Sequence, residues 1–86
     1  MIFEYDKGKS YSNKKKHGID FEQAQELWND PDCIVIPART TDEPRLLLIG
    51  GYDRKIWSAI FTIRNKKIRI ISVRRSRKNE EEIYKS

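Results

Sequence analysis

The sequence has only one cysteine, Cys33, and only one histidine, His17. A lone cysteine cannot form an internal disulfide, so a reducing compartment is its natural home, and no neighbouring base suggests a catalytic thiol. No apolar run approaches the ~20 residues of a membrane span, and residues 1–9 carry charges where a signal peptide needs apolar side chains. We therefore expect a cytoplasmic protein without a membrane association.

Metal ligands are equally scarce. Besides the single His and Cys, no pair of carboxylates stands at ligand spacing outside the loops and the C-terminal run Glu80–Glu82. Structural and catalytic metal sites draw on clusters of exactly these residue types. We expect neither metal nor cofactor, and metal-dependent hydrolysis is disfavoured.

Large apolar side chains are also in short supply. The chain has 86 residues, of which 37% are apolar, below the roughly 45–50% usual for globular domains. This length allows one domain, residues 1–86, with a thin core.

Negative charge is absent from one long stretch. The net charge is +5, which favours association with polyanions. Between residues 54 and 79 there is no carboxylate, and the ten basic residues there are Arg54, Lys55, Arg64, Lys66, Lys67, Arg69, Arg74, Arg75, Arg77 and Lys78. A solvated charged face is the alternative reading, but interleaving with strand residues favours a surface that binds phosphate, most simply RNA.

The N-terminal half predicts a short strand and two helices. Residues 2–5 alternate as a strand does, and residues 7–16 form a helix with Asp6 as N-cap and Gly18 at its end. A second helix begins at Asp20, where Gln23 completes a capping box. It ends at residues 30–32, and its apolar face is formed by Phe21, Ala24, Leu27 and Trp28.

The C-terminal half has the period of strands. We expect strands at 34–36, 46–49, 56–63 and 67–73, with tight turns at 50–53 and 64–66. Residues 77–85 predict a closing helix. The fold class is α+β: an antiparallel sheet of about four strands, two N-terminal helices and one C-terminal helix.

The basic residues suit metal-free RNA cleavage. RNA supplies its own nucleophile, the 2'-hydroxyl, so the protein needs cationic donors for the phosphoryl oxygens and groups that move protons. Arg64, Arg69 and Arg74 carry forked donors that match phosphate. Strand parity places Arg69 and Arg74 on opposite faces unless a bulge near Ile70–Ile71 reverses it.

Two residues are candidates for proton transfer. His17 is the only side chain with an unperturbed pKa near neutrality, although a His before a helix-ending Gly can equally be a surface residue. Glu43 lies in a loop from which its carboxylate could face the arginines. The residues alone do not decide between them.

Several short motifs together resemble the BrnT family of bacterial type II toxins, and the likeness runs from residue 2 to residue 85. The motifs are Phe3-Glu4-Tyr5-Asp6, the Asn13–Gly18 stretch ending Lys16-His17-Gly18, Phe21 with Ala24, Asp30-Pro31, Glu43–Gly50 ending Ile49-Gly50, and Arg69-Ile70-Ile71-Ser72-Val73-Arg74 with Glu80 and Tyr84.

This resemblance implies a RelE-like ribonuclease fold, metal-independent RNA cleavage and arrest of translation. It also implies neutralisation by BrnA, a DNA-binding antitoxin through which operator DNA would be reached. Carried over by position, the site residues are Lys16, His17, Glu43, Arg64, Arg69 and Arg74. The chain departs from the family at Glu43-Pro44-Arg45, where Glu-Arg is common, and at Val73, where Ala is common.

We therefore expect a toxin ribonuclease in which Arg64 and Arg74 clamp the scissile phosphate. His17 or Glu43 would move protons, while the flanking phosphates would be held by Lys15, Lys16 and Arg69. One alternative is a non-catalytic RNA-binding module whose exposed aromatics, such as Tyr52 or Trp57, stack bases. Another is a basic face that binds an acidic protein partner.

Overall fold

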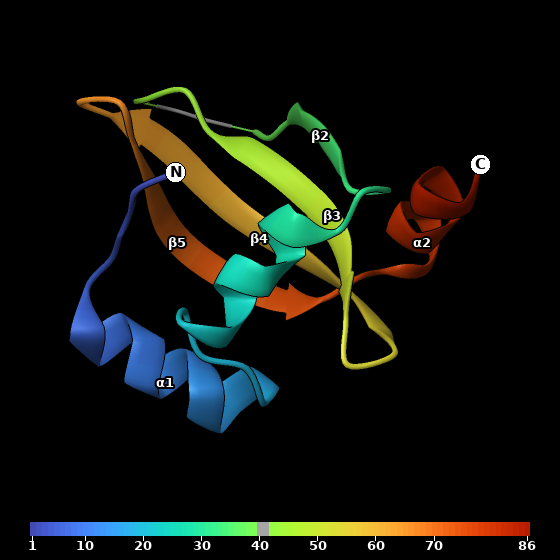
Figure 1. Cartoon of the computed structure of the whole chain (residues 1–86), viewed down its shortest axis with the longest axis horizontal. Helices are drawn as coiled ribbons and strands as arrows, with labels where there is room; N and C mark the ends of the chain where they lie inside the picture. The colour runs from blue at the N-terminus through green and yellow to red at the C-terminus, as the bar shows by residue number, and fades with distance from the viewer. Residues whose placement is uncertain (40–41) are drawn as a thin grey trace.

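The strand pattern of the C-terminal half builds one twisted sheet, with helical segments packed around it (Figure 1). The computed structural model describes residues 1–39 and 42–86. Within this range no helix combines the length and apolar character needed to cross a bilayer. The elements are β1 (Phe3–Glu4), α1 (Lys7–His17), the 3-10 segment η1 (Gln23–Asn29), β2 (Ile34–Pro37), β3 (Leu46–Tyr52), β4 (Lys55–Arg64), β5 (Lys67–Arg75) and α2 (Lys78–Lys85).

Across residues 1–39 and 42–86 the sheet has five strands, in the order β1-β5-β4-β3-β2. Strands β2 to β5 form the expected antiparallel meander, whereas β1 pairs in parallel with β5, placing Phe3 opposite Ile68. The prediction of about four antiparallel strands was therefore wrong in strand number and in direction. The pairing of β1 depends on a contact between the two ends of the chain, which a local pattern of alternation does not encode.

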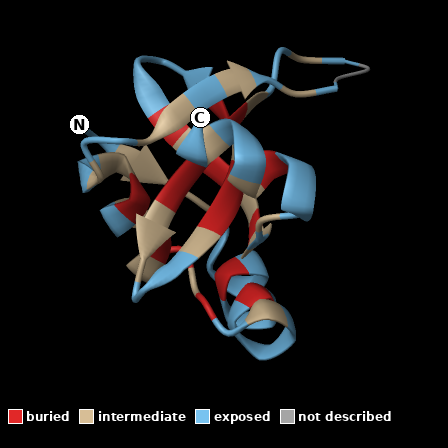
Figure 2. Ribbon diagram, turned by 90° about the vertical axis from the view of Figure 1, so that its right-hand side faces the viewer, coloured by how far each residue is buried: buried red, intermediate tan, exposed pale blue. Residues whose placement is uncertain are grey.

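The core lies between one face of the sheet and the two N-terminal helical segments. Figure 2 shows buried residues concentrated along the middle of the strands. From the sheet this face contributes Leu48, Ala59, Phe61, Ile70 and Val73, together with Trp57 and Ile68. Cys33 packs partly buried against this core, and burial raises the pKa of its thiol.

The second predicted helix is a 3-10 segment instead of an α-helix. Its capping box is present: Asp20 Oδ1 accepts from Gln23 N at 2.7 Å, and Gln23 Oε1 accepts from Asp20 N at 3.0 Å. The fully buried residues Phe21, Ala24 and Leu27 recur every three positions, which is the 3-10 repeat of 3.0 residues per turn. Trp28, which suggested the longer α-helical period, is only partly buried. The expectation of two N-terminal helices was therefore wrong in detail, because this segment is a 3-10 helix.

Helix α1 has the predicted ends and lies along the edge of β5. Asp6 caps its start through Lys9 N at 3.0 Å, and Gly18 ends it in the left-handed region at φ 83°. Where β5 continues past its pairing with β1, the buried side-chain amide of Asn13 takes the place of a neighbouring strand. It donates to Val73 O at 2.9 Å and accepts from Val73 N at 3.2 Å. Pairing of the Val73 backbone in this way fixes the helix against the sheet.

The first hairpin turn differs from the prediction. Gly50 and Gly51 lie inside β3, and the turn is formed by Asp53 and Arg54, with φ values of 52° and 64°. A Cβ at Gly50 would meet the Leu27 carbonyl oxygen at 3.1 Å. Glycine here therefore permits the close approach of η1 to β3. The second turn, at Asn65 and Lys66, is where it was predicted.

Candidate active site

A β-bulge brings the predicted arginines onto one face of the sheet. On β4, Ile60 pairs with Ser72 and Phe61 pairs with Ile70, so Ile71 has no opposite residue. Arg69 then lies opposite Thr62 and Arg74 opposite Ser58, two β4 residues of equal parity. Arg64, which shares that parity, lies on the same face. The bulge that the parity argument required is therefore present, and all three arginines face away from the core.

The arginines form a row along this face. Arg64 stands six residues beyond Ser58 on β4, whereas Arg74 is opposite Ser58. At ~3.3 Å per residue their backbones are roughly 20 Å apart, with Arg69 between them. The expectation that Arg64 and Arg74 clamp one phosphate does not fit this register. The row suits contacts with successive phosphates instead.

The side chain of Arg74 lines a groove of about 420 Å³ on this face of the sheet. Leu47 and Ile60 are its apolar floor, residues 37–39 at the end of β2 form one wall, and the start of α2 forms the other. The lining is Pro37, Ala38, Arg39, Leu47, Ile60, Arg74, Arg77 and Glu80. Three guanidinium groups and one carboxylate give the lining a net formal charge of +2.

A hydrogen-bonded network behind the groove centres on Glu80, which is only 7% exposed. Its two oxygens accept from Arg74 Nη1 at 2.8 Å and Nη2 at 2.9 Å. One of them also accepts from Ser58 Oγ at 2.9 Å and from Arg77 N at 2.8 Å. Glu80 therefore fixes the Arg74 guanidinium and the first turn of α2 together.

This network shifts the pKa of both charged partners. Hydrogen bonds from Arg74, reinforced by the donors Arg77 N and Ser58, lower the pKa of Glu80 to about 2 despite its burial. The hydrogen bond to Glu80 raises the pKa of Arg74. Both groups are therefore charged at physiological pH, and Glu80 is a very weak base.

The depressed pKa makes part of the stability dependent on pH. Glu80 has a lower pKa in the folded state, about 2, than its ordinary 4.5. Its contribution is present above pH 4.5, amounts to about 3 kcal/mol, and is lost as the pH falls towards 2. Urea unfolding of the wild type and of Glu80→Gln should show a stability difference that shrinks over this range. Asp6 and Asp30 also have lowered pKa values, but they are present in both proteins and cancel in the difference. A stability difference that does not change with pH would therefore contradict the lowered pKa of Glu80.

Arg74 retains donors for a ligand. Of its five N–H groups, two bind Glu80 and one reaches Arg75 O at 3.3 Å. Among contacts with the described residues, two N–H groups remain to meet a phosphate oxygen. Arg39 and Arg77 are exposed and add charge that Glu80 does not compensate.

The C-terminal end of α2 is held by a second group of hydrogen bonds, which centres on Asp30. Tyr84 donates its hydroxyl to Asp30 Oδ2 at 2.6 Å, and Gly51 N donates to the same oxygen at 2.7 Å. The bond to Asp30 raises the pKa of Tyr84 to about 12. Burial opposes ionisation of Asp30, but bonds from Tyr84, Asp32 N and Gly51 N outweigh it and lower the pKa of Asp30. Fastening at both ends makes α2 a fixed wall of the groove.

The other predicted arginines have carboxylate neighbours. Arg64 Nη2 contacts Glu43 Oε2 at 3.0 Å, so the loop does place that carboxylate against an arginine. Arg69 lies 3.8 Å from Glu4 across the β1–β5 pairing. Both pairs are partly exposed and contribute little to stability, which leaves these arginines available to a polyanion.

The residues predicted on the first helix lie elsewhere. His17 is partly buried in the last turn of α1, and neither it nor Glu43 is among the groove lining. Lys15 and Lys16 are exposed on the same helix, where Lys15 Nζ lies 4.8 Å from the Tyr11 ring centroid. In Figure 1, α1 lies at the lower left beside β5, and α2 lies at the right, on the β3 side of the sheet.

The structure also changes the list of candidate residues. Trp57, expected as an exposed stacking residue, is 5% exposed, donates its indole N–H to Tyr52 O and packs under Arg75. Arg39, Arg77 and Glu80 belong to the groove but were not predicted as site residues. Of these three residues, only Glu80 was among the motifs that resemble the BrnT family. Within the described residues, no three His, Cys, Asp or Glu side chains gather as a metal site would require.

Comparison with known proteins identifies the family. The family model described as "Ribonuclease toxin, BrnT, of type II toxin-antitoxin system" matches residues 5–80. The chain belongs to the BrnT family. No curated protein matches it. The match covers α1, every strand from β2 to β5 and the first residues of α2, up to and including Glu80.

Membership of the BrnT family indicates the general activity of the protein and its kinds of partner. A BrnT chain is the ribonuclease toxin of a type II toxin-antitoxin system, which implies an RNA substrate and an antitoxin partner. The arginine-lined groove carries guanidinium groups of the kind that bind phosphate oxygens.

Proposed function

We propose that this toxin is a metal-independent endoribonuclease that cleaves RNA through the 2'-hydroxyl and thereby inhibits translation. The observation that carries the proposal is the groove in which Glu80 holds the Arg74 guanidinium beside Arg39 and Arg77. A fixed guanidinium group is the donor that a phosphoryl group needs when charge develops on its oxygens.

The cleavage step follows from this arrangement. The scissile phosphate lies in the groove, and the 2'-hydroxyl oxygen of the preceding nucleotide attacks the phosphorus. A 2',3'-cyclic phosphate forms while the bond to the 5'-oxygen breaks. Negative charge increases on the non-bridging oxygens, and the remaining Arg74 N–H groups bind them more tightly in the transition state than in the ground state.

Two proton transfers accompany this step: the 2'-hydroxyl loses a proton and the departing 5'-oxygen gains one. Glu80 is excluded as the base because its pKa is about 2 and its oxygens bind four donors. Glu43 and His17 were the predicted groups for these transfers, but neither lines the groove, and Glu43 contacts Arg64 at the far end of the arginine row. For a phosphate held at Arg74, water in the open groove therefore takes the proton from the 2'-hydroxyl and supplies one to the departing 5'-oxygen. Glu43 and His17 would move these protons only for a phosphate bound beside them.

The rest of the basic surface holds the substrate. Arg64 and Arg69 continue the row of positive charge away from the groove, and Lys15 and Lys16 bind more distant phosphates. Such contacts give affinity that falls with salt and carries little sequence information. The protein acts in the cytoplasm, and a BrnA-like DNA-binding antitoxin neutralises it and connects it to operator DNA.

The test is cleavage of a 5'-labelled RNA in EDTA, beside the matching DNA and an RNA with 2'-O-methyl groups. We expect cleavage of the unmodified RNA alone, at an undiminished rate, with a cyclic phosphate on the 5' fragment. Cleavage of DNA, or loss of activity in EDTA, would contradict the mechanism. Tight binding without cleavage would favour the non-catalytic RNA-binding alternative.

A further inference from the structure

The chain has an acidic segment opposite in character to its basic one. Residues 18–38 contain no Lys or Arg, and their five carboxylates are Asp20, Glu22, Glu26, Asp30 and Asp32. In a protein of net charge +5 this segregation sets an acidic segment apart from the basic one. RNA is repelled from the acidic one.

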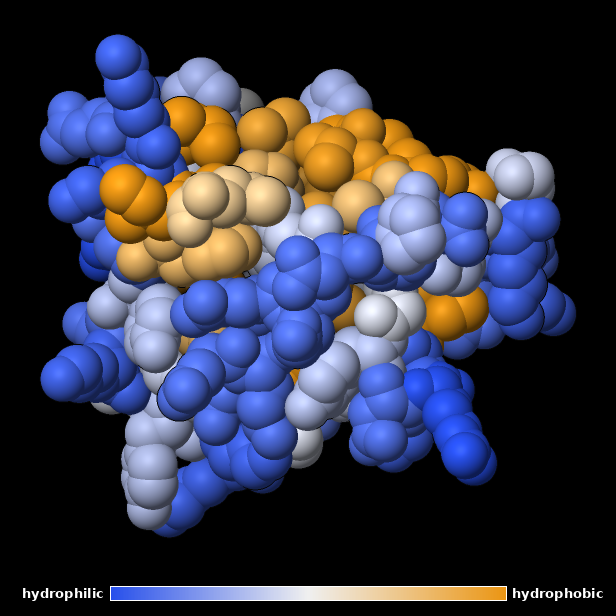
Figure 3. Space-filling model, in the orientation of Figure 1, coloured by the Kyte–Doolittle hydropathy of each residue, from blue (hydrophilic) through white to orange (hydrophobic). Residues whose placement is uncertain are grey.

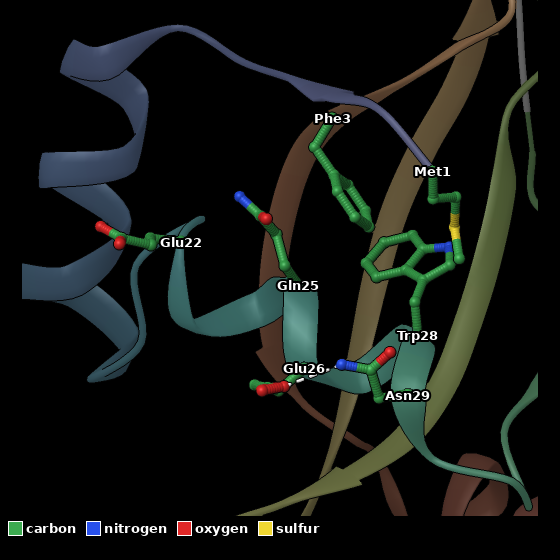
Figure 4. Close-up of a pocket in the computed structure, with 7 residues that line it drawn as sticks. All are labelled: Met1, Phe3, Glu22, Gln25, Glu26, Trp28 and Asn29. Atoms are coloured by element: carbon green, nitrogen blue, oxygen red, sulfur yellow. Dashed lines mark hydrogen bonds between the residues drawn. The ribbon is translucent and has the colours of Figure 1, made fainter.

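Part of this segment borders a hollow of about 450 Å³ (Figure 4). Met1, Phe3 and Trp28 cluster at one side of it, and the side chains of Glu22, Gln25 and Glu26 project from η1 and the turn before it. Trp28 packs edge-on against Phe3 at 5.0 Å and against Phe61 at 5.1 Å. The apolar floor of the hollow is therefore anchored to the core.

The two glutamates at this hollow have no cationic partner in the described chain. Glu26 accepts a hydrogen bond from Asn29 Nδ2 at 2.9 Å, but the ion pairs found among the described residues involve neither Glu26 nor Glu22. Two carboxylates beside an apolar floor are complementary to a lysine or arginine that adjoins an apolar side chain.

Exposed apolar residues extend this surface. Ile2 is 62% exposed and Met1 79%. Ile63 is 53% exposed, and by register it lies on the core face beside Ile68, which pairs with Phe3. In Figure 3 apolar atoms lie near the N-terminus and, more widely, over β2 and β3, with hydrophilic atoms below and at the upper left. Apolar surface of this extent marks a protein partner more than a nucleic acid.

We propose that the hollow is a docking site for the antitoxin, which inserts an apolar side chain flanked by Lys or Arg between Met1, Trp28 and the two glutamates. The toxin's membership of a type II system supplies the protein partner, and the acidic rim supplies the charge it must carry. The hollow and the arginine groove share no lining residue. Antitoxin affinity at this site is therefore separable from RNA cleavage.

The test compares two double variants with the same change of net charge. Glu22→Lys/Glu26→Lys reverses the rim, and Asp42→Lys/Glu82→Lys reverses two exposed carboxylates that line neither the hollow nor the groove. Calorimetric titration with the antitoxin encoded beside the toxin should show at least thirtyfold weaker binding for the rim variant. The control variant should stay within threefold of the wild type, and both should cleave RNA.

The exposed apolar surface beside the hollow is tested by Ile63→Thr, which keeps a β-branched side chain in the strand. We expect binding to weaken about fivefold without loss of cleavage. Unchanged affinity in the rim variant, or equal loss in the rim and control variants, would overturn the proposal. So would a toxin dimer in the absence of antitoxin that dissociates in the rim variant, because a second copy would then be the occupant.

Discussion

Replacing Arg74 by alanine is expected to lower the rate of RNA cleavage by roughly 10²- to 10³-fold, the effect of deleting one fixed donor to a developing oxyanion. Single-turnover kinetics should show the loss in the rate constant more than in RNA affinity. Arg74→Lys should not restore activity, because an ammonium group cannot hold Glu80 with two nitrogens and still donate to phosphate.

Two controls separate catalysis from folding in this experiment. Arg75→Ala removes a neighbouring charge from the opposite face, where Arg75 stacks on Trp57, and should cleave RNA at nearly the wild-type rate. Arg74→Met/Glu80→Gln removes the buried charge pair while keeping an acceptor for Arg77 N and Ser58, so it should recover stability without activity. Activity in that double variant would contradict the role of Arg74.

Replacing Glu80 by alanine is expected to lower the free energy of unfolding by about 3 kcal/mol at pH 7. The change removes the acceptor of four hydrogen bonds and leaves the partly buried Arg74 without its counter-ion, a loss characteristic of broken buried pairs. Urea titration monitored by tryptophan fluorescence measures it, since Trp28 and Trp57 both contact the core.

Glu82→Ala is the matched control, because Glu82 is exposed on the same helix. Its effect should stay within about 0.5 kcal/mol of the wild type. If both variants lost the same stability, the effect would come from charge at the start of α2 and the Glu80 network would have no special role. A folded but inactive Glu80→Ala protein would instead identify Glu80 as the residue that positions Arg74.

Local signals in the sequence predicted the ends of elements well. Asp6, Gly18 and the Asp20–Gln23 capping box act through hydrogen bonds within a few residues, so the chain needs no tertiary partner to reveal them. The period of η1 was misread because Trp28 suggested four-residue spacing where Phe21, Ala24 and Leu27 have three. Which period prevails depends on how closely η1 approaches Gly50, a contact made across the fold.

The candidate site was predicted less completely for the same reason. The parity argument identified that a bulge was needed near Ile71 for Arg69 and Arg74 to share a face, and the register contains it. It did not reveal how far Arg64 lies from Arg74, because it took no account of the lengths of β4 and β5. Arg39 and Arg77 join the groove only because folding places the end of β2 and the start of α2 along its two walls.

The sequence by itself determined the α+β class, the basic character of residues 54–79, the meander of β2 to β5 and the likeness to the BrnT toxins. These follow from the composition, from the two-residue period of the strands and from motifs that can be recognised in the sequence alone. The tertiary structure alone decided which charges meet. Glu80 binds Arg74, β1 joins β5 and the acidic hollow forms around Trp28 because packing brings together residues that neither periodicity nor spacing relates.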